Sequence, residues 1–132
     1  MSDNDTRAFD PLGHIRIAVS NLQESQNFYN ILFDELKFIK VDEEGWASPE
    51  GLGVWIIQAA HPEHRYIFEA PGLHHVCFKV ESKKMVDDLC NFLVVNSIHV
   101  IAPPKSYPQY TPDYYAVFFL DPDGIELEVA YY

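Results

Sequence analysis

The feature that most constrains the fold of this chain is an internal repeat. HIRIAV at residues 14–19 and HVCFKV at residues 75–80 both begin with histidine and end with valine, 61 positions apart. At the same offset, FIKV at 38–41 falls on HVIA at 99–102, and one amphipathic stretch falls on another. Such periods are typical of duplicated supersecondary units. The sequence therefore predicts an α+β fold made of two tandem βαβββ modules.

Alternation and helical periodicity locate the elements within each module. Helices are expected at 20–36 and 81–97, with Ser20 or Asn21 capping the first and Ser82 the second. Strands are expected at 14–19, 36–43, 53–60, 74–80, 98–104, 114–120 and 125–132, with turns at 43–51 and with Pro103 and Pro104 ending the 98–104 strand. A flexible tail at 1–11 would precede a single domain at 12–132, with module one at 12–60 and module two at 73–132.

Composition excludes several classes of partner. The chain carries 20 acidic and 9 basic residues, for a formal net charge of -11, so it should repel nucleic acid and anionic membrane surfaces. No apolar run approaches the roughly 20 residues of a membrane span, and the N-terminal stretch does not resemble an export signal. The two cysteines form no CxxC motif. We therefore expect a cytoplasmic protein with reduced thiols.

Adjacent histidines, His74 and His75, enter the strand at 74–80, and the repeat distinguishes them. His75, rather than His74, corresponds to His14 in the first module. Because neighbouring strand residues point to opposite faces, His14 and His75 should lie on the face away from the helices. His74 is expected on the helix-packed side or at the strand edge, bonded to nearby backbone.

The last strand supplies a third kind of side chain to that face. Glu126 and Glu128 alternate with apolar neighbours, so both glutamates should share a face with His14 and His75. Two histidines and a carboxylate from three strands can form a facial triad, which leaves positions open on a divalent metal for water or substrate. Unrelated polar residues on an exposed sheet face would give the same alternation, so the pattern leaves both interpretations open.

Longer segments carry a family resemblance. HIRIAVSNLQESQNFY, YYAVFFLDPDGIELEV and the internal repeat resemble the vicinal oxygen chelate superfamily, from about residue 12 to the C-terminus. That superfamily includes glyoxalase I, fosfomycin-resistance thiol transferases, extradiol dioxygenases, methylmalonyl-CoA epimerase and bleomycin-binding proteins. The resemblance implies paired βαβββ modules, a cupped mixed sheet and a homodimer, whose sites are often shared across the interface.

The resemblance also implies one divalent metal ion per subunit, held by His14, His75 and Glu128. His75 lies five residues before the strand-ending valine, and Glu128 lies four residues after the glycine of DPDG. Glu126 does not match a ligand position and is expected to be an exposed strand residue. Gln58, taken as the counterpart of Glu128, is a possible fourth ligand or an ordinary polar strand end. Zn, Ni, Mn and Fe all suit these donors.

The function implied by the resemblance is a metalloenzyme that chelates a small oxygen-rich substrate. It would be a glyoxalase-like lyase or isomerase, with Glu128 as its catalytic residue. One alternative is a metal-free drug-binding dimer of the bleomycin-resistance type, because the acidic chain suits a cationic ligand. Another is a single-domain Fe(II) dioxygenase, since two imidazoles and a carboxylate suit that ion.

Four further side chains are predicted to contact a small-molecule substrate. Arg16 and Lys79 share the sheet face of the predicted metal ligands and could hold an anionic group, or be ion-paired strand residues. Tyr107 and Tyr115, with two more tyrosines at 110 and 114, flank a proline-containing loop that could close over the cleft. Packing or dimer contacts are the alternative role for these tyrosines.

Overall fold

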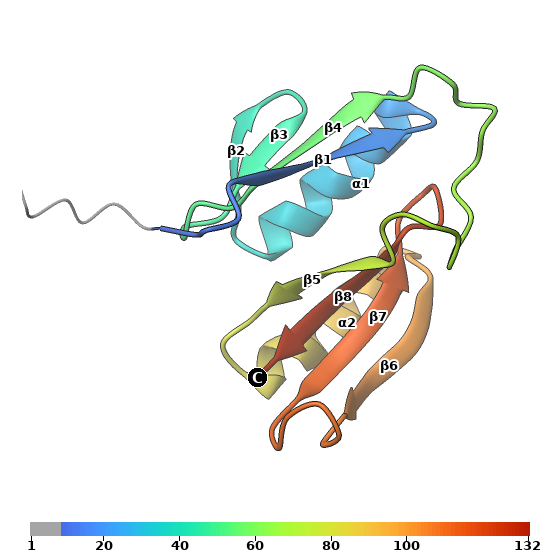
Figure 1. Cartoon of the computed structure of the whole chain (residues 1–132). Coiled ribbons are helices and arrows are strands. Elements are labelled where there is room, and N and C mark those ends of the chain that lie inside the picture. Colours follow the sequence, from blue (N-terminus) through green and yellow to red (C-terminus); the bar gives the residue numbers. More distant parts are fainter. Residues whose placement is uncertain (1–8) are drawn as a thin grey trace, which may run out of the picture. The chain divides into compact units, whose positions relative to one another are not determined.

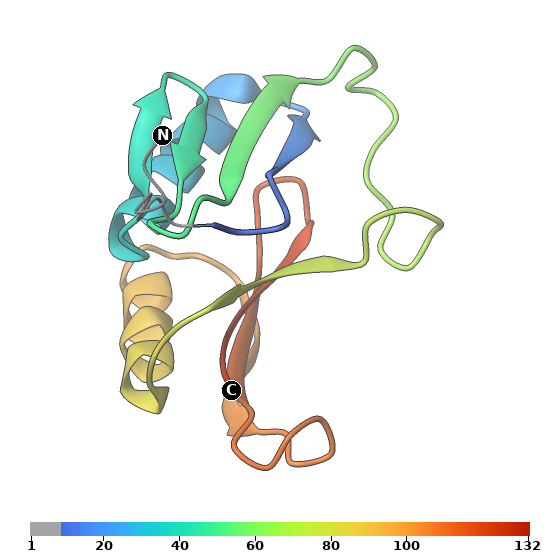
Figure 2. The same cartoon turned by 60° about the vertical axis from the view of Figure 1, so that its left-hand side comes forward.

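The computed structural model describes residues 9–132, so most of the predicted tail at 1–11 lies outside the described residues. The chain divides into two compact units. The first ends at His64 and the second spans Arg65–Tyr132. This division falls in the connection expected between modules one and two. Each unit combines one helix with one four-stranded sheet (Figures 1 and 2).

The two units repeat one topology. The first contains β1 (His14–Val19), α1 (Leu22–Glu35), β2 (Ile39–Asp42), β3 (Gly45–Ala47) and β4 (Gly53–Gln58). The second contains β5 (His75–Lys79), α2 (Lys83–Val95), β6 (Val100–Ser106), β7 (Tyr115–Leu120) and β8 (Glu126–Tyr131). The strand orders are β1-β4-β3-β2 and β5-β8-β7-β6, and the first pair in each sheet is parallel. The predicted α+β fold of two tandem βαβββ modules is confirmed.

Each helix begins at a side-chain cap that the sequence predicts. The Asn21 side chain accepts a hydrogen bond from the backbone N–H of Glu24, and Ser82 accepts one from Met85. These bonds satisfy amide groups that have no partner within the first turn. Among the described residues, no helix is long and apolar enough to cross a lipid bilayer.

The core of each unit lies between its helix and one face of its sheet. In the first unit, Phe33 of α1 packs on Trp46 of β3, with ring centroids 5.3 Å apart. In the second, α2 contacts β6, β7 and β8, and it lies to one side of their sheet in Figure 2. Leu127 and Val129 of β8 are buried in this second core. The opposite face of β8, which carries Glu126 and Glu128, is therefore left for a site.

The strands differ from the prediction in two places. Residues 43–51, where turns were expected, hold turns and also the short strand β3, which pairs with both β2 and β4. Strand β6 runs through Pro103 and Pro104 instead of ending there. It is an edge strand whose pairing with β7 shifts register between Ala102 and Lys105, and such positions tolerate prolines that cannot donate a ladder hydrogen bond.

Candidate functional site

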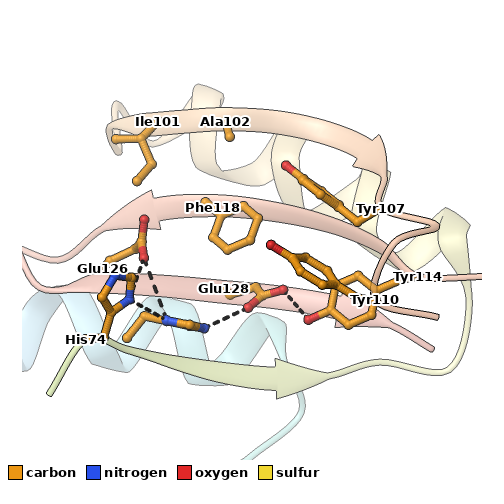
Figure 3. A pocket seen from close by; sticks show the side chains of 10 residues that line it. His74, Ile101, Ala102, Tyr107, Tyr110, Tyr114, Phe118, Glu126 and Glu128 are labelled. Carbon is orange, nitrogen blue, oxygen red and sulfur yellow. Dashed lines mark hydrogen bonds and ion pairs between the residues drawn. The ribbon is translucent and has the colours of Figure 1, made fainter.

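A pocket of about 660 Å³ lies in the second unit, on the sheet face that carries Glu126 and Glu128. Figure 3 shows side chains from all four strands and the adjoining loops converging on it. The lining residues are His74, His75, Ile101, Ala102, Tyr107, Tyr110, Tyr114, Phe118, Glu126 and Glu128. The pocket thus joins an aromatic wall to a cluster of imidazoles and carboxylates.

The parallel pairing of β5 with β8 brings His75 and Glu128 together. In this register His75 lies opposite Glu126, and Cys77 lies opposite Glu128. The His75 ring reaches along the sheet, so that its Nε2 lies 3.1 Å from Glu128 Oε1. Glu128 is only 2% exposed, and the Tyr114 hydroxyl donates a 2.5 Å hydrogen bond to its other oxygen, Oε2. Both carboxylate oxygens of Glu128 therefore have a partner.

The buried surroundings of Glu128 keep two neighbouring side chains protonated, the Tyr114 hydroxyl and the Cys77 thiol. Burial, and then the hydrogen bond to Glu128, raises the pKa of Tyr114, so its hydroxyl remains a donor. Burial and then the negative charge of Glu128 raise the pKa of the Cys77 thiol to about 12. Cys77 is therefore a neutral thiol near neutral pH and a poor nucleophile there.

The raised Cys77 pKa predicts a loss of stability in alkaline solution. The unfolded thiol ionises near pH 9.0 and the folded one near pH 12, so its contribution is complete below pH 9.0 and disappears as pH rises toward 12. Between pH 8 and pH 10 the wild type should lose roughly 1 kcal/mol more unfolding free energy than Cys77→Ala. Urea unfolding at each pH measures this difference, and parallel curves for both proteins would contradict it.

On the other side of the His75 ring lies a second group of polar side chains, which we call the Nδ1 cluster: His74, His75 and Glu126. The two Nδ1 atoms are 2.9 Å apart. Glu126 Oε2 lies 3.7 Å from Nδ1 of His74 and 3.8 Å from Nδ1 of His75. One nitrogen or oxygen from each residue falls within 4.8 Å of the others, close enough for the three to share a metal ion.

This cluster bears on two expectations. His74 was expected on the helix-packed side or at the strand edge, and it lies at the strand edge: it precedes the first residue of β5, and its ring lines the same pocket beside Phe68. Strand alternation does not apply there, because His74 lies outside the strand. Glu126 was expected to be exposed, but it is 8% exposed, because β8 is an inner strand of its sheet and Glu126 faces the pocket.

Of the three substrate contacts predicted in the second unit, one lines the pocket and two do not. Tyr107 lines the pocket and stacks on Tyr110. The Tyr115 hydroxyl instead donates to Asp87 of α2 at 2.6 Å, and Lys79 Nζ lies 4.1 Å from the centre of the Tyr132 ring. Neither Tyr115 nor Lys79 is among the lining residues. The contact of Tyr114 with Glu128 was not predicted. Strand alternation holds the signal for it, because Phe118 pairs with Glu128 and Tyr114 lies four residues before Phe118.

In the first unit, His14 and Arg16 share a separate pocket of about 320 Å³ with Trp55. The His14 and Trp55 rings meet edge to face at 6.1 Å. Strand β1 pairs His14 with Gly53 and Arg16 with Trp55, as β5 pairs His75 with Glu126 and Cys77 with Glu128.

The counterpart of Glu128 in this register is therefore Trp55, and the expectation that Gln58 corresponds to it is wrong. Gln58 ends β4 opposite Val19. Its amide accepts a hydrogen bond from the Leu22 N–H at 3.0 Å and donates one to the Ser20 carbonyl at 2.9 Å. These bonds tie β4 to the segment that begins α1.

The donors around His75 fit a divalent metal ion. The 3.1 Å separation of His75 Nε2 and Glu128 Oε1 is what two ligands about 2.1 Å from one ion would have at nearly a right angle. Imidazole and carboxylate together suit Zn, Ni, Mn and Fe. A buried carboxylate also gains from a nearby cation, because leaving its charge uncompensated is costly.

Comparisons with known proteins agree with this fold. Residues 11–129 match the family model of the Glyoxalase/Bleomycin resistance protein/Dioxygenase superfamily. The uncharacterized protein YqjT of Bacillus subtilis (strain 168) is 30% identical over 124 residues, which cover 89% of this chain and 95% of that protein.

Solved structures show the same fold at lower identity. A glyoxylase/bleomycin resistance protein/dioxygenase domain from Frankia sp. EAN1pec superimposes with a TM-score of 0.73 at 21% identity, covering 94% of this chain and 98% of its own. A lactoylglutathione lyase from Agrobacterium tumefaciens gives 0.57 at 19% identity, covering 89% and 90%. The duplicated βαβββ topology and the match over most of its length show that this chain belongs to the glyoxalase/bleomycin resistance protein/dioxygenase superfamily.

Proposed function

We propose that the chain is a divalent-metal-dependent enzyme that chelates a small oxygen-rich substrate and acts as a glyoxalase-like lyase or isomerase. The observation that carries the proposal is the pairing of His75 Nε2 with the buried Glu128 carboxylate beside a pocket of about 660 Å³. Family membership and the lactoylglutathione lyase among its structural neighbours support the reaction class. We further propose a homodimer, as the family resemblance implies, and a cytoplasmic location, as expected from the cysteine usage of the sequence.

His75 and Glu128 would hold the ion, with His14 as the third ligand implied by the family resemblance. Zn, Ni, Mn or Fe would be present at one ion per subunit. The bound ion supplies a Lewis acid that polarises substrate oxygens. Gln58 stays a predicted fourth ligand; in the structure its amide is bonded to backbone groups of the first unit.

Glu128 is the proposed general base. Oε1 of this carboxylate would have to leave the ion to take a proton from a substrate carbon next to a carbonyl group, and would then return the proton to the neighbouring carbon, while the Tyr114 hydroxyl holds Oε2 and fixes the orientation of the group. The aromatic wall around Tyr107 and Phe118 would exclude water from the reacting atoms. Arg16, Lys79, Tyr107 and Tyr115 stay predicted contacts for the substrate.

Metal content tests this proposal directly. Protein purified without chelator should contain about one divalent ion per chain, and Glu128→Gln should bind that ion at least about tenfold more weakly, since it loses a charged ligand. His99→Ala is the matched control, because His99 is an exposed residue outside the pocket. A wild-type protein that binds none of Zn, Ni, Mn or Fe(II) after reconstitution would overturn the proposal.

The aromatic wall favours a second candidate function, metal-free binding of a flat cationic molecule. Tyr107 and Tyr110 stack at 5.6 Å, and Tyr107 meets Phe118 edge to face at 5.7 Å, beside two carboxylates. Aromatic faces and carboxylates together attract cations. Binding of such a ligand that survives a strong chelator would favour this candidate, and binding abolished by the chelator would exclude it.

A further inference from the structure

We propose that the Nδ1 cluster is a second divalent-metal site, on the opposite side of the His75 ring from Glu128. Its ligands are Nδ1 of His74, Nδ1 of His75 and the carboxylate of Glu126. The cluster shares His75 with the site proposed above, but it uses neither Glu128 nor His14. All of its ligands belong to the second unit, so it is complete within that unit.

Backbone structure places the three ligands together. His75 and Glu126 are direct partners in the parallel pair of β5 and β8, so both side chains leave the sheet at the same level and on the same face. His74 precedes β5, and its ring lies beside that of His75, with Nδ1 atoms 2.9 Å apart. Two nitrogen ligands about 2.1 Å from one ion lie about 3 Å apart, so the pair already has the required spacing.

Glu126 supplies the charge that would attract the ion. The residue is 8% exposed, and Oε2 of its carboxylate lies 3.7 Å from Nδ1 of His74 and 3.8 Å from Nδ1 of His75. Those separations exceed a hydrogen bond. Glu128, in contrast, already receives the Tyr114 hydroxyl on one oxygen and meets His75 on the other. The less compensated carboxylate is therefore on the Nδ1 side of the ring, and a cation there would offset its burial.

The shared ring makes the two sites mutually exclusive. A neutral imidazole has one nitrogen that carries a proton and one that offers a lone pair. An ion on Nε2 requires the proton on Nδ1, and an ion on Nδ1 requires it on Nε2, where it can be donated to Glu128. The chain would therefore bind one ion at a time, and removing one site would move the ion to the other. Two imidazoles and a carboxylate suit Zn, Co and Ni.

The first unit gives an internal contrast. Its register equivalent of Glu126 is Gly53, which lies opposite His14. The residue before His14 is Gly13, where the second unit has His74. The first unit therefore lacks two of the three ligands at the equivalent positions, and the Nδ1 cluster is a property of the second unit.

The test compares two double variants and their combination. His14→Ala/Glu128→Gln removes the ligands of the first site, and His74→Phe/Glu126→Gln removes those of the second while keeping a ring beside Phe68. Zinc is titrated by calorimetry and cobalt(II) by its visible absorption spectrum, with circular dichroism to confirm folding. Each double variant should still bind one ion, with cobalt spectra that differ from each other. The quadruple variant should bind at least a hundredfold more weakly than either.

The outcomes separate this inference from the proposed function. If His14→Ala/Glu128→Gln binds no ion while His74→Phe/Glu126→Gln matches the wild type, the second site is overturned and the proposed function stands. If the first variant matches the wild type in affinity and spectrum, the ion lies in the Nδ1 cluster and the proposed ligands are wrong. A wild-type chain that binds neither zinc nor cobalt overturns both the second site and the proposed function. If a double variant misfolds, the single variants Glu126→Gln and His74→Phe are titrated in its place to test the second site.

Discussion

Replacing His75 by alanine should abolish metal binding. His75 offers Nε2 beside Glu128 and Nδ1 beside His74 and Glu126, so its loss removes a ligand from either side of the ring. Loss of an outer-shell partner alone weakens a metal site by about 10–100-fold, and loss of this direct ligand should exceed about a hundredfold. Metal content after purification should fall from about one ion per chain to less than a tenth of that.

Two controls make the His75 result specific. His99→Ala should keep the full metal content, because His99 is exposed and outside the pocket. His75→Ala should remain folded, since His75 is partly exposed, although its ring contacts other side chains of the pocket, with ring centroids 5.1 Å from His74 and 6.3 Å from Phe118. A folded His75→Ala protein that retains one ion per chain would rule out both proposed sites.

The largest expected effect on stability comes from Phe33→Ala. The Phe33 side chain is fully buried and stacks on Tyr29 and Phe38, with ring centroids 5.5 and 4.8 Å away. Alanine would leave a cavity that the neighbouring rings can only partly fill, so the loss should be about 3–5 kcal/mol of unfolding free energy. Urea unfolding followed by circular dichroism and by tryptophan fluorescence measures it, since Trp46 contacts Phe33.

Phe9→Ala serves as the comparison for Phe33. Phe9 is 83% exposed, so its replacement should change unfolding free energy by less than about 0.5 kcal/mol. Equal changes in unfolding free energy for the two substitutions would mean that the aromatic stack around Phe33 does not stabilise the first unit more than an exposed side chain does.

Most of the fold could be predicted, because the repeat is visible when the two halves of the sequence are compared and the hydrophobic patterns are local signals. Helix caps at Asn21 and Ser82 depend on a few adjacent residues. Strand β3 escaped prediction because three residues, Gly45–Ala47, are too short to show an alternating pattern. Strand β6 can continue through its two prolines because it lies at the edge of the sheet, and the order of strands in the sheet could not be predicted from the sequence.

The candidate site was predictable to the extent that it follows strand alternation. Alternation placed His75 and Glu128 on one face, and the structure brings them within 3.1 Å. For His74 the sequence left two places open, the helix-packed side or the strand edge, because the first residue of β5 could not be fixed and one residue decides whether alternation applies. The correspondence of Trp55 with Glu128 was not predicted, because it depends on how β4 pairs with β1, and a position counted along β4 alone does not give that register. The role of His14 as a ligand stays a prediction.

The pairing registers also show that the two units differ at two equivalent positions of their inner strands β4 and β8. At the positions where β8 carries Glu126 and Glu128, β4 carries Gly53 and Trp55, and the indole covers that face so closely that a side-chain carbon at Gly53 would collide with it. Removing the indole also removes this obstacle. Two substitutions, Gly53→Glu and Trp55→Glu, would therefore give the first unit (blue to green in Figure 1) its own pair of carboxylates on an existing scaffold.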